Sequence, residues 1–200
     1  MKKRKVSSKL EFTAFHEAGH AVMSYRLRRR LKCVTIEPEP TKRSLGHTQN
    51  TKKIGFRPDL RQQRKIEDEI LICLAGPAAE REKRGLYNHR GAAADYQKAA
   101  DLALYVCADE ICAYTDQHQL CAFVHDVDAE QASAYIRWLQ VKCRKIVELN
   151  WYIIEALASQ LLEHKRIGAR KVRTIIKNAI EADYQARLAL ARRDPKGGAV

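Results

Sequence analysis

The sequence lacks any uncharged stretch of about 18 residues, the length that an apolar helix needs to cross a bilayer. Its basic residues 1–5 are followed by the charged Lys9 and Glu11 and not by an apolar core, so they do not form a secretory signal. None of the six cysteines belongs to a Cys-x-x-Cys pair. We therefore expect no membrane span. We expect the cysteines to be free thiols and the protein to lie in a reducing, cytoplasmic compartment.

The sequence also lacks a Gly-x-x-x-x-Gly-Lys-Ser/Thr loop, internal repeats and a low-complexity linker. Without that phosphate-binding loop, we do not expect the chain to bind ATP in the way that such loops do. A length of 200 residues with 46% hydrophobic residues is enough for one sizeable domain. We place this domain at residues 8–185, between a basic tail of residues 1–7 and a C-terminal tail of residues 186–200.

Acidic residues are fewer than basic ones, 24 against 37, which gives a net charge of +13. Such a charge favours polyanions or an acidic partner surface. The basic residues concentrate in residues 1–5 and 26–32, and the second group falls where we expect the first helix to end, so it complements the helix dipole. Because no nucleic-acid-binding motif accompanies the charge, we do not expect a nucleic-acid partner. A basic nucleic-acid-associated protein is kept as an alternative.

Residues 16–20 read His-Glu-Ala-Gly-His in a segment that we predict to be helical. Residues four apart lie on the same face of a helix, so His16 and His20 can direct two imidazoles at one metal ion. Glu17 then lies close enough to meet a water molecule at that metal. The pattern suits zinc-assisted peptide hydrolysis, although a surface His pair on an ordinary helix has the same spacing.

A catalytic zinc ion takes three protein ligands and keeps one position for water, so a third ligand must come from elsewhere in the chain. Spacing alone does not choose it among six candidates. These are Glu80, His89, Asp95, His118, His125 and His47.

Gly19 is also informative, because glycine inside a helix costs roughly 1 kcal/mol relative to alanine. A metal ion or a crossing element beside Gly19 would explain it.

The periodicity of apolar residues predicts a mainly α-helical fold with a small β-sheet edge near residues 33–50. We predict strands at residues 33–36 and 45–49. Their exposed edge could pair with an extended peptide, and a plain loop is the alternative. Helices are predicted at residues 60–84, at 93–108, at 128–167 and from Ala169 onward.

Three features should interrupt these helices. Gly76-Pro77 should kink or split the helix at residues 60–84. The stretch 128–167 contains no Pro or Gly, and forms either one helix or two joined near Asn150. Gly168 is the expected C-cap at its end.

Between these helices lies a segment rich in cysteine and histidine. It contains Cys107, Cys112, His118, Cys121 and His125. The spacing matches no familiar zinc module, so the role of this segment stays open.

Several motifs, in order, resemble the peptidase domain of the FtsH-type zinc proteases over about residues 10–181. They are residues 16–21 (HEAGHA), 34–38 (VTIEP), 45–48 (LGHT), 74–80 (LAGPAAE), 91–99 (GAAADYQKA) and 161–164 (LLEH). The resemblance implies a mostly α-helical peptidase with one Zn²⁺ per chain. It implies Asp95 as the third zinc ligand beside His16 and His20, and Glu17 as the general base that activates a zinc-bound water. Glu80 would orient a ligand imidazole, or replace Asp95 as the ligand.

The resemblance also implies a substrate strand and a class of substrate. Leu45, Gly46, His47 and Thr48 would form the edge that holds an extended polypeptide. The implied activity is that of a zinc metalloendopeptidase that cleaves unfolded or flexible proteins.

The sequence departs from the family in two respects. Pro77 and Ala94 stand where the family has Gly and Asn, and we find no counterpart of the family's membrane anchor or ATP-driven unfolding module. We therefore expect a separate ATPase chain, if any, to deliver substrates. Homo-oligomers, such as the hexamers of the family, are left open. A non-catalytic zinc-binding regulatory or adaptor module is the alternative function, although structural zinc does not need the base Glu17.

Overall fold

The computed structural model describes residues 8–38, 47–50, 60–107 and 129–193. Its elements are α1 (Ser8–Arg26), β1 (Leu31–Thr35), β2 (His47–Asn50), α2 (Leu60–Arg84), α3 (Ala93–Val106), α4 (Ala129–Leu149), α5 (Trp151–His164), β3 (Arg166–Gly168) and α6 (Ala169–Arg193). The mainly α-helical fold with a small sheet is therefore confirmed.

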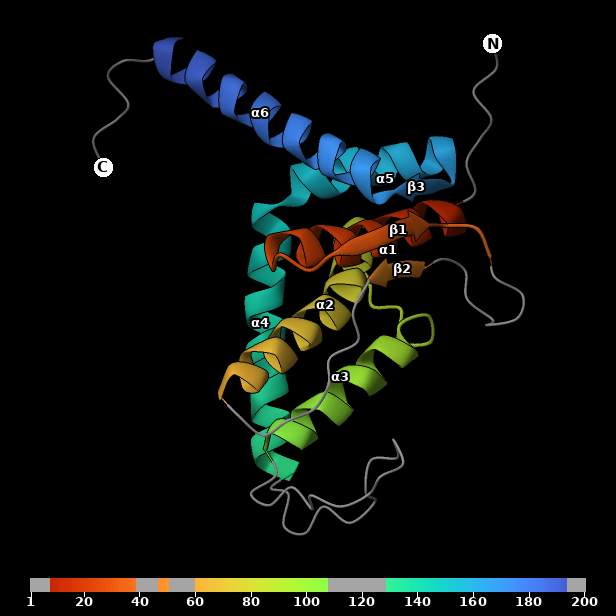
Figure 1. The fold of residues 1–200 in the computed structure, drawn as a ribbon, viewed down its shortest axis with the longest axis vertical. Helices are drawn as coiled ribbons and strands as arrows, with labels where there is room; N and C mark the ends of the chain where they lie inside the picture. The colour runs from red at the N-terminus through yellow and green to blue at the C-terminus, as the bar shows by residue number, and fades with distance from the viewer. Residues whose placement is uncertain (1–7, 39–46, 51–59, 108–128, 194–200) are drawn as a thin grey trace.

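Helix α1 crosses the middle of the molecule, with α2 packed on one side and α5 on another (Figure 1). Helices α3 and α4 pack on α2, and α6 packs on α5, with its C-terminal part directed away from the body (Figure 1). Ala14, Ala18 and Ala21 of α1 are fully buried. Their small side chains allow neighbouring elements to approach α1 closely.

Two glycines set the contact between α1 and α2. A Cβ atom at Gly19 would lie 2.5 Å from the backbone oxygen of Ala75, and one at Gly76 would lie 2.3 Å from Nε2 of His20. Both distances are shorter than van der Waals contact, so only glycine allows this approach. Helix α2 is thus the crossing element that the sequence suggested beside Gly19.

Of the two predicted effects of Gly76-Pro77, a kink or a split, the split is wrong, because α2 continues through Pro77. Proline removes the hydrogen bond that its N–H would donate to the carbonyl four residues earlier. Leu74 and Ala75 before Pro77, and Ala79 after it, are all buried. We attribute the continuity of α2 to this burial, which outweighs one lost hydrogen bond.

The sheet has the order β2-β1-β3, and both pairings are antiparallel. Val34 is fully buried at its centre and pairs with Thr48 on one side and Ile167 on the other. The predicted strands at 33–36 and 45–49 correspond to β1 and β2, but Leu45 and Gly46 lie outside the described residues. Within those residues, no strand pairs with the outer edge of β2.

The third strand was not predicted, and Gly168 is not a helix cap. Helix α5 ends earlier, at His164, because Lys165 adopts a left-handed φ of 60° and its N–H donates to the carbonyl of Leu161. Gly168 instead ends β3, where it pairs with Cys33. This pairing joins residues far apart in the sequence, so local patterns do not reveal it.

Of the two predictions for residues 128–167, the one with two helices is confirmed. The Asn150 side chain donates to the carbonyl of Ile146 at 2.7 Å, which satisfies a backbone acceptor at the end of α4. Helix α6 continues to Arg193, beyond the predicted domain boundary at residue 185. The division into a domain and two tails remains a prediction.

In the described part of the chain, no helix is both long enough and apolar enough to span a membrane. Four cysteines of that part are buried and belong to no disulfide. These are Cys33, Cys73, Cys107 and Cys143. The other residues of the cysteine- and histidine-rich segment, Cys112, His118, Cys121 and His125, lie outside the described residues.

Candidate metal centre

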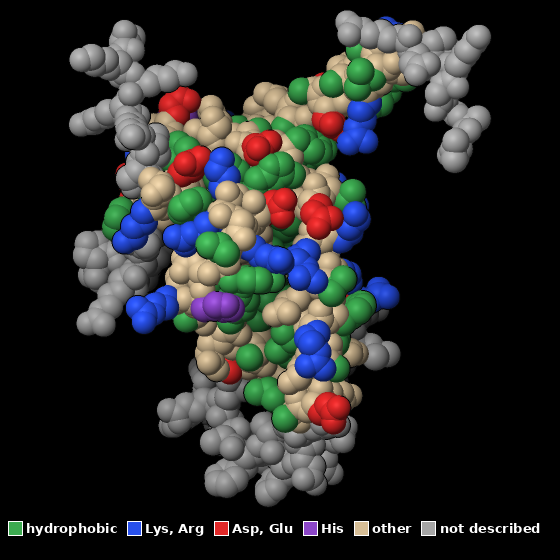
Figure 2. Space-filling model, turned by 180° about the vertical axis from the view of Figure 1, so that it is seen from behind, with side chains coloured by type: hydrophobic (Ala, Val, Ile, Leu, Met, Phe, Trp, Pro, Cys, Tyr) green, Lys and Arg blue, Asp and Glu red, His purple; other side chains and the backbone are tan. Residues whose placement is uncertain are grey.

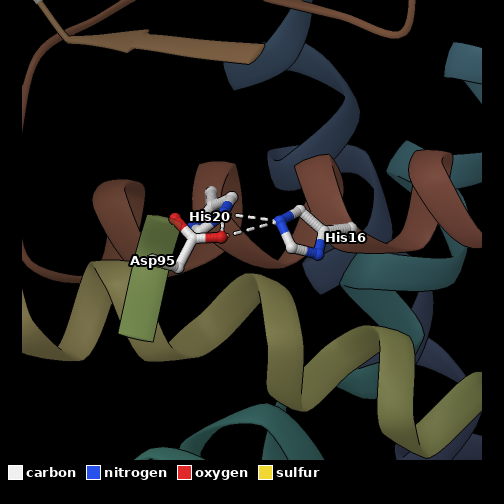
Figure 3. Close-up of side chains that lie close together, drawn as sticks. All are labelled: His16, His20 and Asp95. Carbon is white, nitrogen blue, oxygen red and sulfur yellow. Dashed lines mark hydrogen bonds and ion pairs between the residues drawn. The ribbon is translucent and has the colours of Figure 1, made fainter. Parts of the chain in front are cut away.

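The two histidines of α1 meet at their Nε2 atoms, which lie 3.1 Å apart. They are one helical turn apart, and their rings approach edge to face with centroids separated by 4.7 Å. His20 is buried and His16 is partly buried. Figure 3 shows both imidazoles directed toward one point beside α1.

Asp95 reaches the same point from the first turn of α3 (Figure 3). Its Oδ2 lies 3.1 Å from Nε2 of His16 and 3.5 Å from Nε2 of His20. One ligand atom from each of the three side chains lies within 4.8 Å of the other two, a spacing suited to a shared metal ion. Among the sequence candidates for a third ligand, Asp95 is the one that the described structure brings to both histidines.

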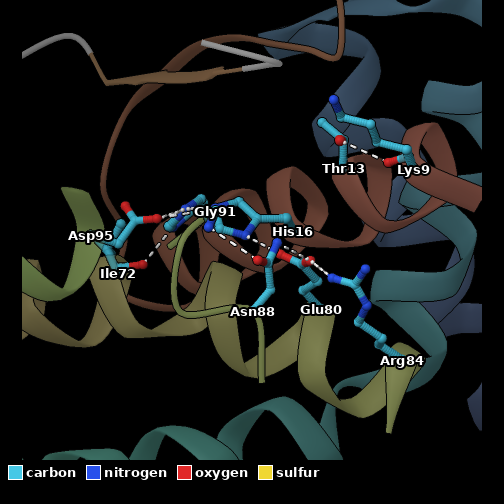
Figure 4. Close-up of polar contacts among 10 residues, drawn as sticks. Lys9, Thr13, His16, Ile72, Glu80, Arg84, Asn88, Gly91 and Asp95 are labelled. Carbon is cyan, nitrogen blue, oxygen red and sulfur yellow. Dashed lines mark hydrogen bonds and ion pairs between the residues drawn. The ribbon is translucent and has the colours of Figure 1, made fainter. Parts of the chain in front are cut away.

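The other nitrogen of each imidazole has a partner of its own. Nδ1 of His20 lies 2.7 Å from the carbonyl oxygen of Ile72, and Nδ1 of His16 lies 3.2 Å from Oε2 of Glu80 (Figure 4). A carbonyl oxygen only accepts, so Nδ1 of His20 carries the hydrogen, and in the neutral ring Nε2 keeps its lone pair. Glu80 favours the same tautomer of His16. Both Nε2 atoms are thus prepared to bind a metal, as in carboxylate–histidine–zinc arrangements.

Glu80 is itself held by two donors. Its Oε1 accepts hydrogen bonds from Arg84 at 3.1 Å and from Asn88 at 2.8 Å (Figure 4). Asn88 also accepts a hydrogen bond from the backbone N–H of Gly91 at 3.1 Å, which ties the loop between α2 and α3 to the centre. The sequence did not identify Asn88, although an Asn in a loop bounded by glycines is a turn former.

The charges around the two histidines favour a cation. Burial lowers the pKa of His16, but hydrogen bonds to Asp95 and Glu80 and the charge of Glu17 outweigh it and raise the pKa to about 10. Burial raises the pKa of Asp95, but hydrogen bonds with His16 and His20 outweigh it and hold the pKa well below its usual range. A proton and a bound metal ion would compete for this position.

Glu17 is buried beside the histidines and faces the sheet. Its Oε2 accepts a hydrogen bond of 2.9 Å from the hydroxyl of Thr48 in β2. That hydroxyl also lies 3.2 Å from the backbone oxygen of Glu17, but it has only one hydrogen to donate. The edge strand is therefore joined directly to the carboxylate next to the metal cluster.

The remaining candidates lie elsewhere. Glu80 contacts His16 on the side away from the cluster, as expected for a group that orients an imidazole. His89 lies in the loop before α3, where its ring stacks with Tyr87 at a centroid distance of 5.5 Å. The placement of the His47 side chain, and of His118 and His125 as a whole, lies outside what the structure describes.

Comparison with known families identifies the family of this chain. The model of Peptidase family M41 matches residues 4–109, just over half of the 200 residues. The matched range contains every residue of the cluster, together with Glu17, Thr48 and Glu80. No curated protein sequence matches the chain.

Proposed function

The chain belongs to Peptidase family M41, and we propose that it is a zinc-dependent metalloendopeptidase that cleaves unfolded or flexible polypeptides. The observation that carries this proposal is the convergence of His16, His20 and Asp95 next to the buried carboxylate of Glu17. A purely structural zinc site has no use for an adjacent base.

His16, His20 and Asp95 would hold one zinc ion through Nε2, Nε2 and Oδ2. This donor set fits zinc, which takes imidazole nitrogens and carboxylate oxygens. When bound, zinc supplies a Lewis acid that polarises a carbonyl group and lowers the pKa of a water molecule toward about 7. Glu80 and the carbonyl of Ile72 fix the orientation of the two imidazoles.

Glu17 would act as the general base. It takes one proton from the attacking water, whose oxygen forms the new bond to the scissile carbonyl carbon. When the C–N bond breaks, Glu17 returns this proton to the departing amine, so the products are a carboxylic acid and an amine. Thr48 donates to Oε2 of Glu17, and Oε1, which accepts no hydrogen bond from the described residues, would receive the proton.

The outer edge of β2 would hold the substrate. An extended peptide that pairs with this edge would lie along Leu45, Gly46, His47 and Thr48, and thus beside Glu17. Because strand pairing requires an extended backbone, unfolded or flexible polypeptides are the expected substrates. Folded proteins would need a separate ATPase chain to unfold them, and a homo-oligomer could enclose the site. Because the four described cysteines are buried and form no disulfide, we propose a cytoplasmic location.

The substitution Glu17→Gln tests the catalytic role. The variant should keep about one zinc ion per chain but lose casein hydrolysis by at least a factor of roughly 10². Zinc content by atomic absorption and release of casein peptides are the two measurements. Normal hydrolysis by the variant would refute the role of Glu17. A wild-type chain that binds zinc but cleaves nothing would favour the regulatory or adaptor module.

A further inference from the structure

A second concave site lies on a different face of α2 from the metal centre. Leu74, Ala78 and Arg81 of α2 line it, at spacings of four and three residues that place them on one stripe of the helix. Gln140, Cys143 and Arg144 of α4 form the opposite wall. The pocket is small and partly open to solvent.

Two arginines from different helices share this pocket. Arg81 and Arg144 are both half-buried, and neither has a carboxylate partner within the described part of the chain. By contrast, Arg84 and Arg187 pair with Glu80 and Asp183. Two partly desolvated positive charges that face one pocket raise its affinity for an anion.

The rest of the lining adds donors and no acidic group. Tyr87 and Tyr96 complete the pocket from the loop and from α3. The guanidinium of Arg81 lies over the Tyr87 ring, 4.3 Å from its centroid. This cation–π contact restrains the orientation of the guanidinium group. Figure 2 shows Lys and Arg side chains gathered across the middle of the face that is turned away in Figure 1.

We propose that this pocket binds a small oxyanion, a carboxylate or a phosphate group, between Arg81 and Arg144. The planar guanidinium group matches both kinds of oxyanion with paired hydrogen bonds. The tyrosine hydroxyls and the Gln140 amide can donate further hydrogen bonds. The apolar floor of Leu74 and Ala78 excludes water from one side and so strengthens these contacts.

The pocket adjoins the segments that hold the metal centre. Tyr87 precedes Asn88, which donates to Glu80, and Tyr96 follows Asp95. An oxyanion bound in the pocket therefore restrains the loop at residues 85–92. This binding does not depend on the proposed peptidase activity, and it can be measured whether or not the chain cleaves peptides.

Thermal unfolding of the full, zinc-loaded chain tests the proposal with two probes, inorganic phosphate and acetate. Each is compared with sodium chloride at equal ionic strength and pH. At about ten times the dissociation constant, the probe that fits should raise Tm by roughly 2–5 °C. A rise with phosphate alone identifies a phosphate ligand, and a rise with acetate alone identifies a carboxylate.

Substitution of the two arginines tests whether the probe binds in this pocket. The double variant Arg81→Gln, Arg144→Gln should lose this rise in Tm. The control Arg173→Gln, Lys177→Gln removes two exposed charges from α6 and should keep it. Hydrogen exchange of residues 85–92 should slow with the probe in the wild type and in the control only.

Two results would overturn the proposal. One is no rise in Tm with either probe. The other is a rise that the double variant retains, which would mean that the anion binds at the zinc ion or elsewhere. If the double variant does not fold, Arg144→Lys replaces it. That variant keeps the charge but loses the planar fork, so the rise should fall by at least about half.

Discussion

The N-terminal elements, α1 to α3 with β1 and β2, differ from the C-terminal elements, α4 to α6 with β3, in what they contribute. The first group supplies every side chain of the metal cluster, together with Glu17, Thr48 and Glu80. To this metal centre, the second group contributes packing. The Trp151 ring of α5 stacks on Phe15 of α1 at a centroid distance of 5.3 Å. The family match ends at residue 109, close to where the contribution to the chemistry ends.

The two groups also hold α1 in different ways. On the side of α2, the contact is polar and specific, because His16 and His20 bond to Glu80 and to the carbonyl of Ile72. On the side of α5, the contact is apolar, with Ile154, Leu157 and Leu161 all buried. Polar contacts fix orientation, whereas apolar contacts supply stability with less demand on geometry. Substitutions in the first group should therefore change zinc binding or rate, and substitutions in the second should change stability.

The largest effect on the first group is expected from Asp95→Asn. This change keeps an oxygen at the cluster but removes the negative charge that balances the cation, so zinc affinity should fall by more than about 100-fold. Competition with a fluorescent zinc chelator measures the affinity. Asp101→Asn, six residues further along α3, is the control, since Asp101 accepts a hydrogen bond only from the exposed Gln97 among the described contacts. Equal affinity in both variants would exclude Asp95 as a ligand.

A smaller effect on zinc is expected from Glu80→Gln. The carboxylate accepts from His16, Arg84 and Asn88, whereas an amide has one oxygen to accept and would turn its NH₂ toward a donor. We expect zinc affinity to fall by about 10- to 100-fold while the ligands remain in place. The exposed Glu82→Gln on the same helix should leave the affinity unchanged. If Glu80 were the true third ligand, its loss would exceed that of Asp95→Asn.

The difference between the two groups also marks what the sequence could predict. His16 and His20 are linked by helical periodicity alone, so their meeting follows from their spacing. Asp95 is 75 residues beyond His20, and only the family resemblance selected it among six candidates. Strand β3 depends on contacts between segments far apart in the sequence, and the hydrogen bond from Asn88 to Glu80, eight residues apart, depends on how the loop after α2 folds. Local sequence patterns do not predict such contacts, because they form only when the chain packs into its tertiary structure.

The next substitution should change the rate of peptide hydrolysis and leave the zinc content unchanged. Thr48→Val replaces the hydroxyl that donates to Glu17 by a methyl group of similar size, so the carboxylate loses a hydrogen bond and its fixed orientation. We expect kcat for a peptide substrate to fall by roughly 10-fold, with zinc content unchanged. Thr48→Ser restores the donor and should restore most of the rate. A rate that changes equally in both variants would mean that Thr48 acts through packing in β2.

The smallest effect on the metal centre is expected from Trp151→Ala, in the C-terminal group. Loss of the ring stacked on Phe15 should lower the free energy of unfolding by about 2 kcal/mol, because a half-buried aromatic side chain and its stacking partner are separated. Chemical denaturation measures this, and zinc per folded chain should stay unchanged. Trp138→Ala is the matched control, since Trp138 is 52% exposed on α4 and its loss should cost less than about half as much. A fall in the zinc affinity of the folded Trp151→Ala chain would show that α5 positions the cluster as well as stabilising it, and the two groups would no longer be separate in function.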